Sequence, residues 1–130
     1  MAKTIVRPPG LADPSRRAYS HGVRVGNQLF LAGQTGTDHG MGSDVDRFEA
    51  QTRRTFARMQ TILEAAGGSL ANLVTMTVFI TDMRFGDQFI ALRAEILGPA
   101  GDYPASALIG VSHLANPDAL LEIQSIAALD

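Results

Sequence analysis

The sequence predicts one α/β (α+β) domain, residues 1–130, built from a mixed six-stranded sheet with two helices on one face. Two observations carry this prediction. Six short runs with strand character and two helical patterns follow one another in the order β-β-β-α-β-α-β-β. A chain of 130 residues is also typical of a single domain. Because both helices are expected on one face, the other face lacks cover, and we expect it to be covered by self-association.

The first three strands are predicted from period-two patterns and from turn residues between them. A short strand is expected at residues 4–6, followed by an extended segment that is rich in proline. Strands at 19–25 and 28–33 flank Gly26-Asn27, a dipeptide typical of a two-residue hairpin turn. The second of these strands runs into small residues, whose backbone amides could be approached by a ligand.

Two helices are predicted from apolar residues at three- and four-residue spacing. The first follows the N-cap Ser43 and ends at Gly67-Gly68. The second covers residues 83–97 and is closed by Gly98-Pro99. The apolar stripe of the first helix comprises Val45, Phe48, Thr52, Phe56, Met59, Leu63 and Ala66, and that of the second Phe85, Phe89, Leu92 and Ile96.

The remaining three strands are expected at 73–80, 105–111 and 120–128. The first has almost no polar residue, which is typical of a strand covered on both faces. A turn at Asn116-Pro117-Asp118 separates the last two, which we expect to form a hairpin at the C-terminal end, as at the N-terminal end.

Composition excludes several classes of function. A net charge of −2 gives no reason to expect nucleic acid or an anionic membrane as a partner. Without cysteine there is no disulfide, thiolate nucleophile or zinc–thiolate site. The three histidines have no metal-binding spacing, and no dinucleotide or phosphate-loop motif is present. No apolar run is long enough to span a bilayer, and no secretory signal is seen. We therefore expect a cytoplasmic protein without a metal or a cofactor.

Candidate polar groups for chemistry are few. Glu122 and Gln124 share one side of the last predicted strand, so either of them could face a cleft. A polar outer face of an edge strand explains the same pattern equally well. His21 lies on an earlier strand, and an imidazole can accept a proton near neutral pH, although a packed or solvated histidine is the more common case.

Five segments in the same order and spacing resemble the RidA/YjgF family. They are residues 19–23 (YSHGV), 31–34 (LAGQ), 74–82 (VTMTVFITD), 103–105 (YPA) and 122–127 (EIQSIA). The resemblance implies a chorismate-mutase-like subunit that assembles as a homotrimer with clefts between subunits. It also implies cofactor-independent hydrolysis of reactive enamines and imines, which gives a 2-keto acid and ammonia.

In one group of residues, Tyr19 and Gly33 agree with what the family implies, and Ala32 and Gln124 depart from it. Tyr19 matches the site tyrosine, Gly33 matches the glycine whose backbone holds the ligand, and Ala32 stands where deaminating members usually have serine. Gln124 aligns with the last-strand glutamate that orients or activates the attacking water. An amide can position water but cannot take its proton at neutral pH. We therefore expect catalytic roles for Tyr19, Gln124 and His21.

A second group departs from the family. Ser106 follows the Pro-Ala dipeptide, where the family has an arginine that grips the substrate carboxylate. Leu108 replaces a cysteine, and Ile90 aligns with an asparagine of the second helix. A hydroxyl does not replace a bidentate guanidinium, and losing a charged contact costs about 2–4 kcal/mol unless another cation takes its place. Arg93 and Arg24 are the candidates, and we expect Arg93 to line the cleft with Ser106.

Two hypotheses follow. In the first, the protein is a Rid-type hydrolase or deaminase-like enzyme that acts on a small enamine, imine or related C–N metabolite with an altered substrate range. In the second, it is a non-catalytic Rid-like trimer that binds a small ligand or a protein through the same cleft. Ammonia release from freshly generated imines discriminates between the two.

Overall fold

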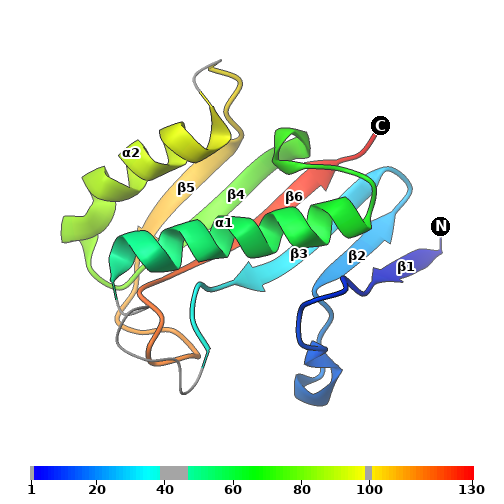
Figure 1. Cartoon of the computed structure of the whole chain (residues 1–130), viewed down its shortest axis with the longest axis horizontal. Coiled ribbons are helices and arrows are strands. Elements are labelled where there is room, and N and C mark those ends of the chain that lie inside the picture. Colours follow the sequence, from blue (N-terminus) through cyan, green and yellow to red (C-terminus); the bar gives the residue numbers. More distant parts are fainter. Residues whose placement is uncertain (1, 39–46, 99–100) are drawn as a thin grey trace.

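The computed structural model describes residues 2–38, 47–98 and 101–130. In this part of the chain six strands form one sheet in the order β1-β2-β3-β6-β4-β5, and both α-helices lie on one face of it (Figure 1). The elements are β1 (Lys3–Val6), β2 (Gly22–Val25), β3 (Gln28–Gln34), α1 (Phe48–Ala65), β4 (Leu73–Ile80), α2 (Gly86–Leu97), β5 (Ala105–Gly110) and β6 (Leu121–Ala128). The predicted fold class and order of elements are confirmed.

The expected C-terminal hairpin is wrong. β5 pairs in parallel with β4, whereas β6 lies antiparallel to both β3 and β4 and separates them. β5 and β6 are therefore neighbours of β4 on its two sides and do not pair with each other. A parallel neighbour needs a crossover, which α2 supplies, and the strand pattern alone does not reveal which partner each strand takes.

The N-terminal strand prediction was too long at its beginning. β2 starts at Gly22, so Tyr19 precedes the strand, and a short 3₁₀ helix (Pro14–Arg17) comes before them both. Asp13 caps this helix by accepting a hydrogen bond from the backbone N–H of Ser15. Ala18, with a φ of +66°, ends it in the left-handed region.

The helix boundaries agree with the sequence pattern where they are described. The expected N-cap Ser43 and the stripe residue Val45 lie outside the described residues, and α1 begins at Phe48. A 3₁₀ turn (Met83–Phe85) precedes α2, and Gly98 ends α2 with a φ of +96°.

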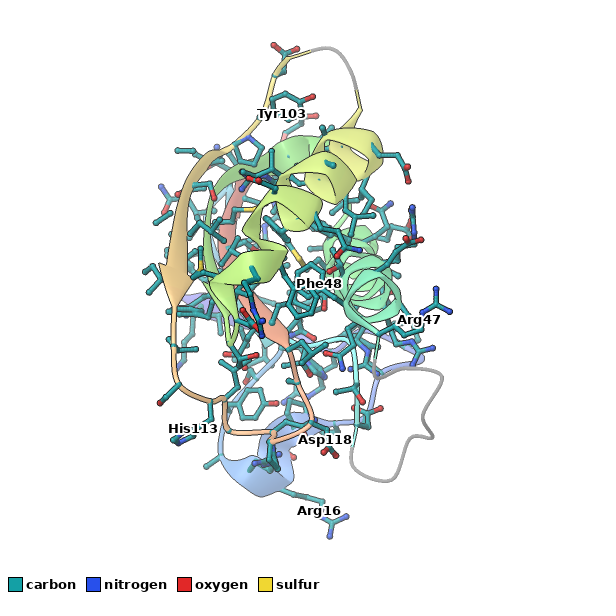
Figure 2. All side chains as sticks on the ribbon, turned by 90° about the vertical axis from the view of Figure 1, so that its left-hand side faces the viewer. Arg16, Arg47, Phe48, Tyr103, His113 and Asp118 are labelled. Atoms are coloured by element: carbon teal, nitrogen blue, oxygen red, sulfur yellow. The ribbon has the colours of Figure 1, made fainter. Side chains whose placement is uncertain are left out.

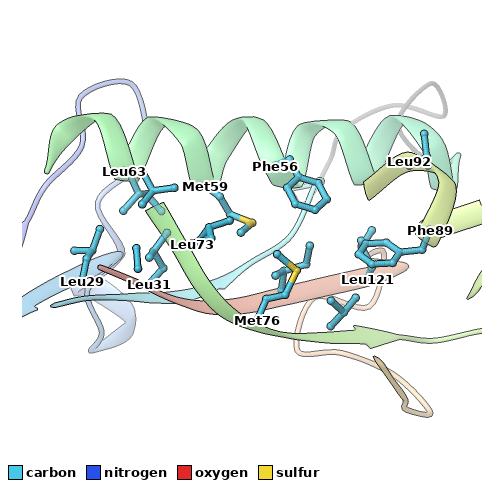
Figure 3. Packing of buried hydrophobic residues seen from close by; sticks show 14 of the residues in the cluster. Leu29, Leu31, Phe56, Met59, Leu63, Leu73, Met76, Phe89, Leu92 and Leu121 are labelled. Atoms are coloured by element: carbon cyan, nitrogen blue, oxygen red, sulfur yellow. The ribbon is translucent and has the colours of Figure 1, made fainter. Parts of the chain in front are cut away.

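The hydrophobic core lies between the two helices and the sheet (Figure 3). Its largest fully buried side chains come from both helices and from β3, β4 and β6: Phe56, Phe89, Leu29, Leu31, Met59, Ile62, Leu63, Met76, Ile80, Leu121 and Ile123. Phe48 stacks on Phe85 with their ring centroids 4.6 Å apart, which joins the start of α1 to the turn before α2. This core confirms the predicted stripes and fixes one face of the sheet.

The opposite face of the sheet has no helix over it in the described part of the chain (Figure 1). Apolar side chains on this face include Phe30 of β3 and Ile109 of β5, which are 40% and 41% exposed. Phe30 pairs with Ile126, and Phe79 pairs with Ile109, so the apolar residues extend across the sheet. The expectation that a second copy covers this face stays a prediction.

Candidate functional site

A cavity of about 620 Å³ opens beside the C-terminal end of β3. Its walls come from the segment before β2, from β3 and the residues after it, from α1, from the β5–β6 connection and from β6. Figure 2 shows that the β5–β6 connection, marked by His113 and Asp118, lies at the same end of the molecule as the short helix that carries Arg16. Tyr103 lies at the opposite end (Figure 2).

The local geometry of β3 brings its backbone close to Glu122 of β6. The pairing of β3 with β6 is irregular between Leu31 and Gln34, which is where Ala32 and Gly33 lie. A Cβ atom on Gly33 would overlap the Glu122 carboxyl group and lie 2.9 Å from its Cδ. Only glycine leaves that space, so Gly33 and Glu122 form one wall of the cavity together.

Glu122 is a half-buried carboxylate that lacks a hydrogen-bond or ion-pair partner among residues 2–38, 47–98 and 101–130. Burial raises the pKa of Glu122 above the ordinary value of a glutamate, because a charged carboxylate is poorly solvated there. An acid in such a place can hold a water molecule and take a proton from it.

His21 has both ring nitrogens engaged. Its Nε2 lies 2.8 Å from the carbonyl oxygen of Ala12, and its Nδ1 lies 3.3 Å from Nε2 of Gln34. A carbonyl can only accept, so Nε2 of His21 carries the proton and Nδ1 accepts from the Gln34 amide. Tyr19 meets the His21 ring edge-on, with centroids 6.3 Å apart. These contacts fit a histidine that fixes the cavity wall better than one that takes a proton.

The rest of the wall is fastened by hydrogen bonds to backbone carbonyls. Arg58 of α1 donates to the carbonyl of Thr35 at 3.0 Å and pairs with Asp38 at 2.9 Å. Asn116 donates to the carbonyl of Thr37 at 3.0 Å. The charge of Arg58 is therefore compensated within the wall, and the segment after β3 is held on two sides.

Buried Gln51 of α1 holds the β5–β6 connection against the helix. Its Nε2 donates to the carbonyl of Asp118 at 3.0 Å, and its Oε1 accepts from the backbone N–H of Leu120 at 2.8 Å. Gly36 packs so closely on the Gln51 backbone that a Cβ there would collide with it. Through these contacts α1 sets the position of both loops at this end of the sheet.

The residues expected in the site fall into two separate groups. Tyr19, His21, Ala32 and Gly33 line the cavity. Ser106, Leu108, Ile90 and Arg93 do not line it and lie where β5 meets α2. Arg24, the other candidate cation, donates to the carbonyls of Gly26 and Ala66 instead.

Gln124 is also absent from the cavity lining. It lies exposed on β6 opposite Thr77 of β4, two positions after Glu122 in the same strand. The alignment that gave Gln124 the role of the glutamate missed the carboxylate that the structure places beside Gly33. The sequence indicated the correct side of the strand, because Glu122 and Gln124 lie on the same side of it. The pairing of β6 with β3 determines that Glu122 is the one beside Gly33.

Several charged side chains outside the cavity form ion pairs on the surface. Arg53 of α1 forms ion pairs with Glu49 of the same helix and with Glu95 of α2. Within the described ranges, no group of three or more His, Cys, Asp or Glu side chains is placed to hold a metal ion. No helix there is long and apolar enough to cross a membrane.

The structure is an α+β fold with a cavity at the end of β3, and comparison with known proteins gives its family. Residues 11–129 match the family model described as Endoribonuclease L-PSP. A RutC family protein from Pyrococcus horikoshii is 37% identical over 110 residues, which cover 84% of this chain and 85% of that protein. The chain belongs to this family, which is also known as RidA/YjgF.

Other relatives cover nearly the whole chain. A protein from Dermatophagoides farinae named 2-iminobutanoate/2-iminopropanoate deaminase is 30% identical over 131 residues, 98% of each chain. A crystal structure of a protein of unknown function from Pseudomonas aeruginosa has a TM-score of 0.89 at 30% identity, with 99% of this chain and 94% of that chain covered. A putative endoribonuclease L-PSP from Entamoeba histolytica has a TM-score of 0.85 at 29% identity, with 98% and 100% covered.

Proposed function

We propose that this protein hydrolyses the C=N bond of small imines, or of the enamines that tautomerise to them, and releases ammonia. The observation that carries the proposal is the half-buried carboxylate of Glu122, which lies beside the backbone of Gly33 and has no partner in the part of the chain that the structure describes. The Dermatophagoides farinae relative, which matches over 98% of the chain, is named for the deamination of 2-imino acids and supports the same reaction class.

The chemistry balances without a cofactor. Glu122 takes a proton from water as the water oxygen bonds to the imine carbon, and it returns this proton to the imine nitrogen, which gives a tetrahedral amino alcohol. Glu122 then carries the hydroxyl proton to the same nitrogen, the C–N bond breaks, ammonia leaves, and the oxygen becomes the carbonyl of the product. Tyr19 lines the cavity and offers a hydroxyl to the substrate, while His21 keeps the wall in place. Gln124, away from the cavity, takes no part in the step.

We further propose that the chain forms a homotrimer in which each cleft lies between two subunits. The uncovered apolar face of the sheet supports association, and the separation of the expected site residues into two groups supports a site completed by another copy. Light scattering of the purified protein at micromolar concentration tests this. A monomer would contradict it.

The test of the reaction is ammonia release from freshly generated imines of several 2-oxo acids and of uncharged carbonyl compounds. We expect release above background, reduced about a hundredfold or more by Glu122→Gln. The matched control is Gln124→Ala, a change on the same side of the same strand, which should retain activity. If no imine gives ammonia above background, the alternative holds, and the protein is a non-catalytic binder of a small ligand or a protein.

A further inference from the structure

The segment that joins β1 to β2 forms one wall of the cavity but buries none of its own side chains. Residues 11–18, which we call the strap, include the short 3₁₀ helix Pro14–Arg17, and none of them is buried. Figure 1 shows this short helix, in blue, beyond the end of β2 and away from both α-helices. Leu11 is the contact of the strap with the hydrophobic core and is only partly buried there, so the strap gains little stability from that core.

Hydrogen bonds hold the strap together internally but hardly tie it to the rest of the molecule. Asp13 accepts from the backbone N–H of Ser15 at 3.0 Å, and the N–H of Ala18 donates to the carbonyl of Ser15 at 2.9 Å. Among the described residues, one hydrogen bond leads from the strap to the rest of the chain: Nε2 of His21 donates to the carbonyl of Ala12 at 2.8 Å. The backbone of His21 is itself fixed, because its carbonyl accepts a hydrogen bond from β3 at 2.8 Å.

The strap borders two hollows. Pro14 and Arg17 line the cavity of about 620 Å³. A second hollow of about 110 Å³ is lined by Leu11, Pro14 and Ser15 of the strap and by Ile5 of β1. Protein interiors are normally close-packed, so a segment that borders two hollows has few atoms to separate from when it moves. Local opening should therefore be easier for the strap than for the segment after β3, which is held on two sides.

Both ends of the strap have a conformation about which the chain can pivot. Gly10, just before the strap, has a φ of +88°, and the space around its Cβ position is empty within 4 Å. Ala18, its last residue, has a φ of +66° and is the one non-glycine residue with a positive φ among the described residues. An alanine in the left-handed region is strained, and rotation out of that region relieves the strain. Strain at Ala18 thus favours opening, and the hydrogen bond between His21 and Ala12 opposes it.

We propose that the strap is a lid over the cavity and that it turns about Gly10 and Ala18. The hydrogen bond from His21 to Ala12 is the latch that holds it closed. This inference rests on the proposed function and adds how access to that site is controlled: the open strap admits ligand, and the closed strap shields the ligand from bulk water. Tyr19 follows the hinge directly, so closure also sets the position of its side chain in the cavity. A ligand in the cavity contacts the closed strap and favours that state.

Limited digestion with trypsin measures how often the strap opens. Arg16 and Arg17 are exposed in the strap, and trypsin cleaves after arginine only where the backbone can leave its folded conformation. We expect His21→Phe, which removes the latch, to speed cleavage after these two residues about tenfold. Cleavage after Arg54, in α1, reports global unfolding and should stay the same. His113→Phe changes an exposed histidine outside the cavity, and as the matched control it should alter neither rate.

A second variant separates the latch from the histidine ring. His21→Gln keeps a side-chain N–H that can donate to the carbonyl of Ala12, so its cleavage rate should lie between those of the unmodified protein and His21→Phe. An unchanged rate of strap cleavage in His21→Phe overturns the proposal. So does a rise in α1 cleavage by the same factor, because the strap would then open only together with the rest of the fold.

Closure on a ligand is followed with a fluorescent label. The chain has no cysteine, so Ser15→Cys introduces a single attachment point in the strap, and Gln88→Cys on the exposed face of α2 is the matched control. The probe is 2-oxobutanoate, the product that hydrolysis of 2-iminobutanoate would give. At saturation we expect it to change the emission of the strap label alone and to slow trypsin cleavage in the strap about fivefold or more. Binding of 2-oxobutanoate, measured by ligand-observed NMR, without either effect overturns the proposal.

Failure of the inference is distinguishable from failure of the proposed function. Release of ammonia from imines, together with strap cleavage that His21→Phe does not alter, supports the reaction and rejects the lid. Strap cleavage that depends on the latch, in a protein that releases no ammonia from any imine, supports the lid and rejects the reaction. The trypsin comparison of the His21 variants needs no ligand, so it decides on the latch even if 2-oxobutanoate does not bind.

Discussion

The cavity beside β3 and the edge formed by α2 and β5 each contain a half-buried charge that has no ion-pair partner among the described residues, and the two charges have opposite sign. In the cavity the charge is the carboxylate of Glu122, and at the edge it is the guanidinium of Arg93. Burial disfavours the charged form of both groups, which raises the pKa of the acid and lowers that of the base. The cavity thus supplies a carboxylate that could activate water, and the edge supplies a cation that could bind the carboxylate of a small acid.

The two regions are also built differently. The cavity depends on backbone geometry: an irregular strand pairing, Gly33, and loops fixed by Gln51 and Arg58. The edge depends on side chains alone, because Arg93 rests on Phe89 and Ser106. A backbone site tolerates little change in shape, whereas a side-chain site can be rebuilt from different residues. This difference explains why the cavity agrees better with the family resemblance than the edge does.

The largest effect is expected for Gly33→Ala. The new methyl group meets the end of a flexible side chain, so the Glu122 carboxylate is displaced while the fold survives. We expect kcat/KM for ammonia release to fall about a hundredfold with little change in Tm, as expected for a misplaced catalytic group. Gly86→Ala in α2 is the control, since the nearest side-chain atom to its Cβ, Cε of Met83, is 3.5 Å away. Equal activity of both variants would reject a cavity that depends on the backbone.

Gln51→Ala tests whether α1 holds the loop that closes the cavity. The change leaves the carbonyl of Asp118 and the N–H of Leu120 without partners. We expect the free energy of unfolding, measured by chemical denaturation, to fall by about 2–4 kcal/mol. The exposed Gln88→Ala on α2 should stay within about 0.5 kcal/mol of the unmodified protein. A small loss for Gln51→Ala would mean that the loop has another anchor.

His21→Phe separates positioning from catalysis. The variant keeps an aromatic ring beside Tyr19 but loses the hydrogen bonds to Ala12 and Gln34. We expect KM to rise about fivefold through looser binding while kcat changes by less than about twofold. A fall in kcat of about a hundredfold would instead assign proton transfer to His21. His113→Phe, outside the cavity, serves as the control.

The smallest effect concerns stability and pH. The raised pKa of Glu122 means that the folded state holds this proton more tightly than the unfolded state does. The unmodified protein should therefore lose stability relative to Glu122→Gln as pH rises from the ordinary range of glutamate, about 4.3, through the raised value. Thermal unfolding of both proteins across that range measures this. A constant difference in Tm would show that burial does not perturb Glu122. In the same window, ammonia release should rise with pH as the carboxylate forms.

The sequence by itself determined the six strands, the two helices and the faces that they bury. Apolar spacing in α1 and α2 and the continuous run of β4 carry that information locally, because a buried face must repeat with the period of its element. The motifs around Tyr19, Gly33 and Pro104-Ala105 indicated the family before any contact was known.

Only the tertiary structure decided which of these residues meet. Strand pairing placed β6 between β3 and β4, and this brought Glu122 rather than Gln124 to Gly33. It also showed that Arg93, thirteen positions before Ser106, reaches that serine from another element. Spacing along the chain cannot give such contacts, because they depend on the partner that each strand chooses and on the direction in which a long side chain turns across a neighbouring element.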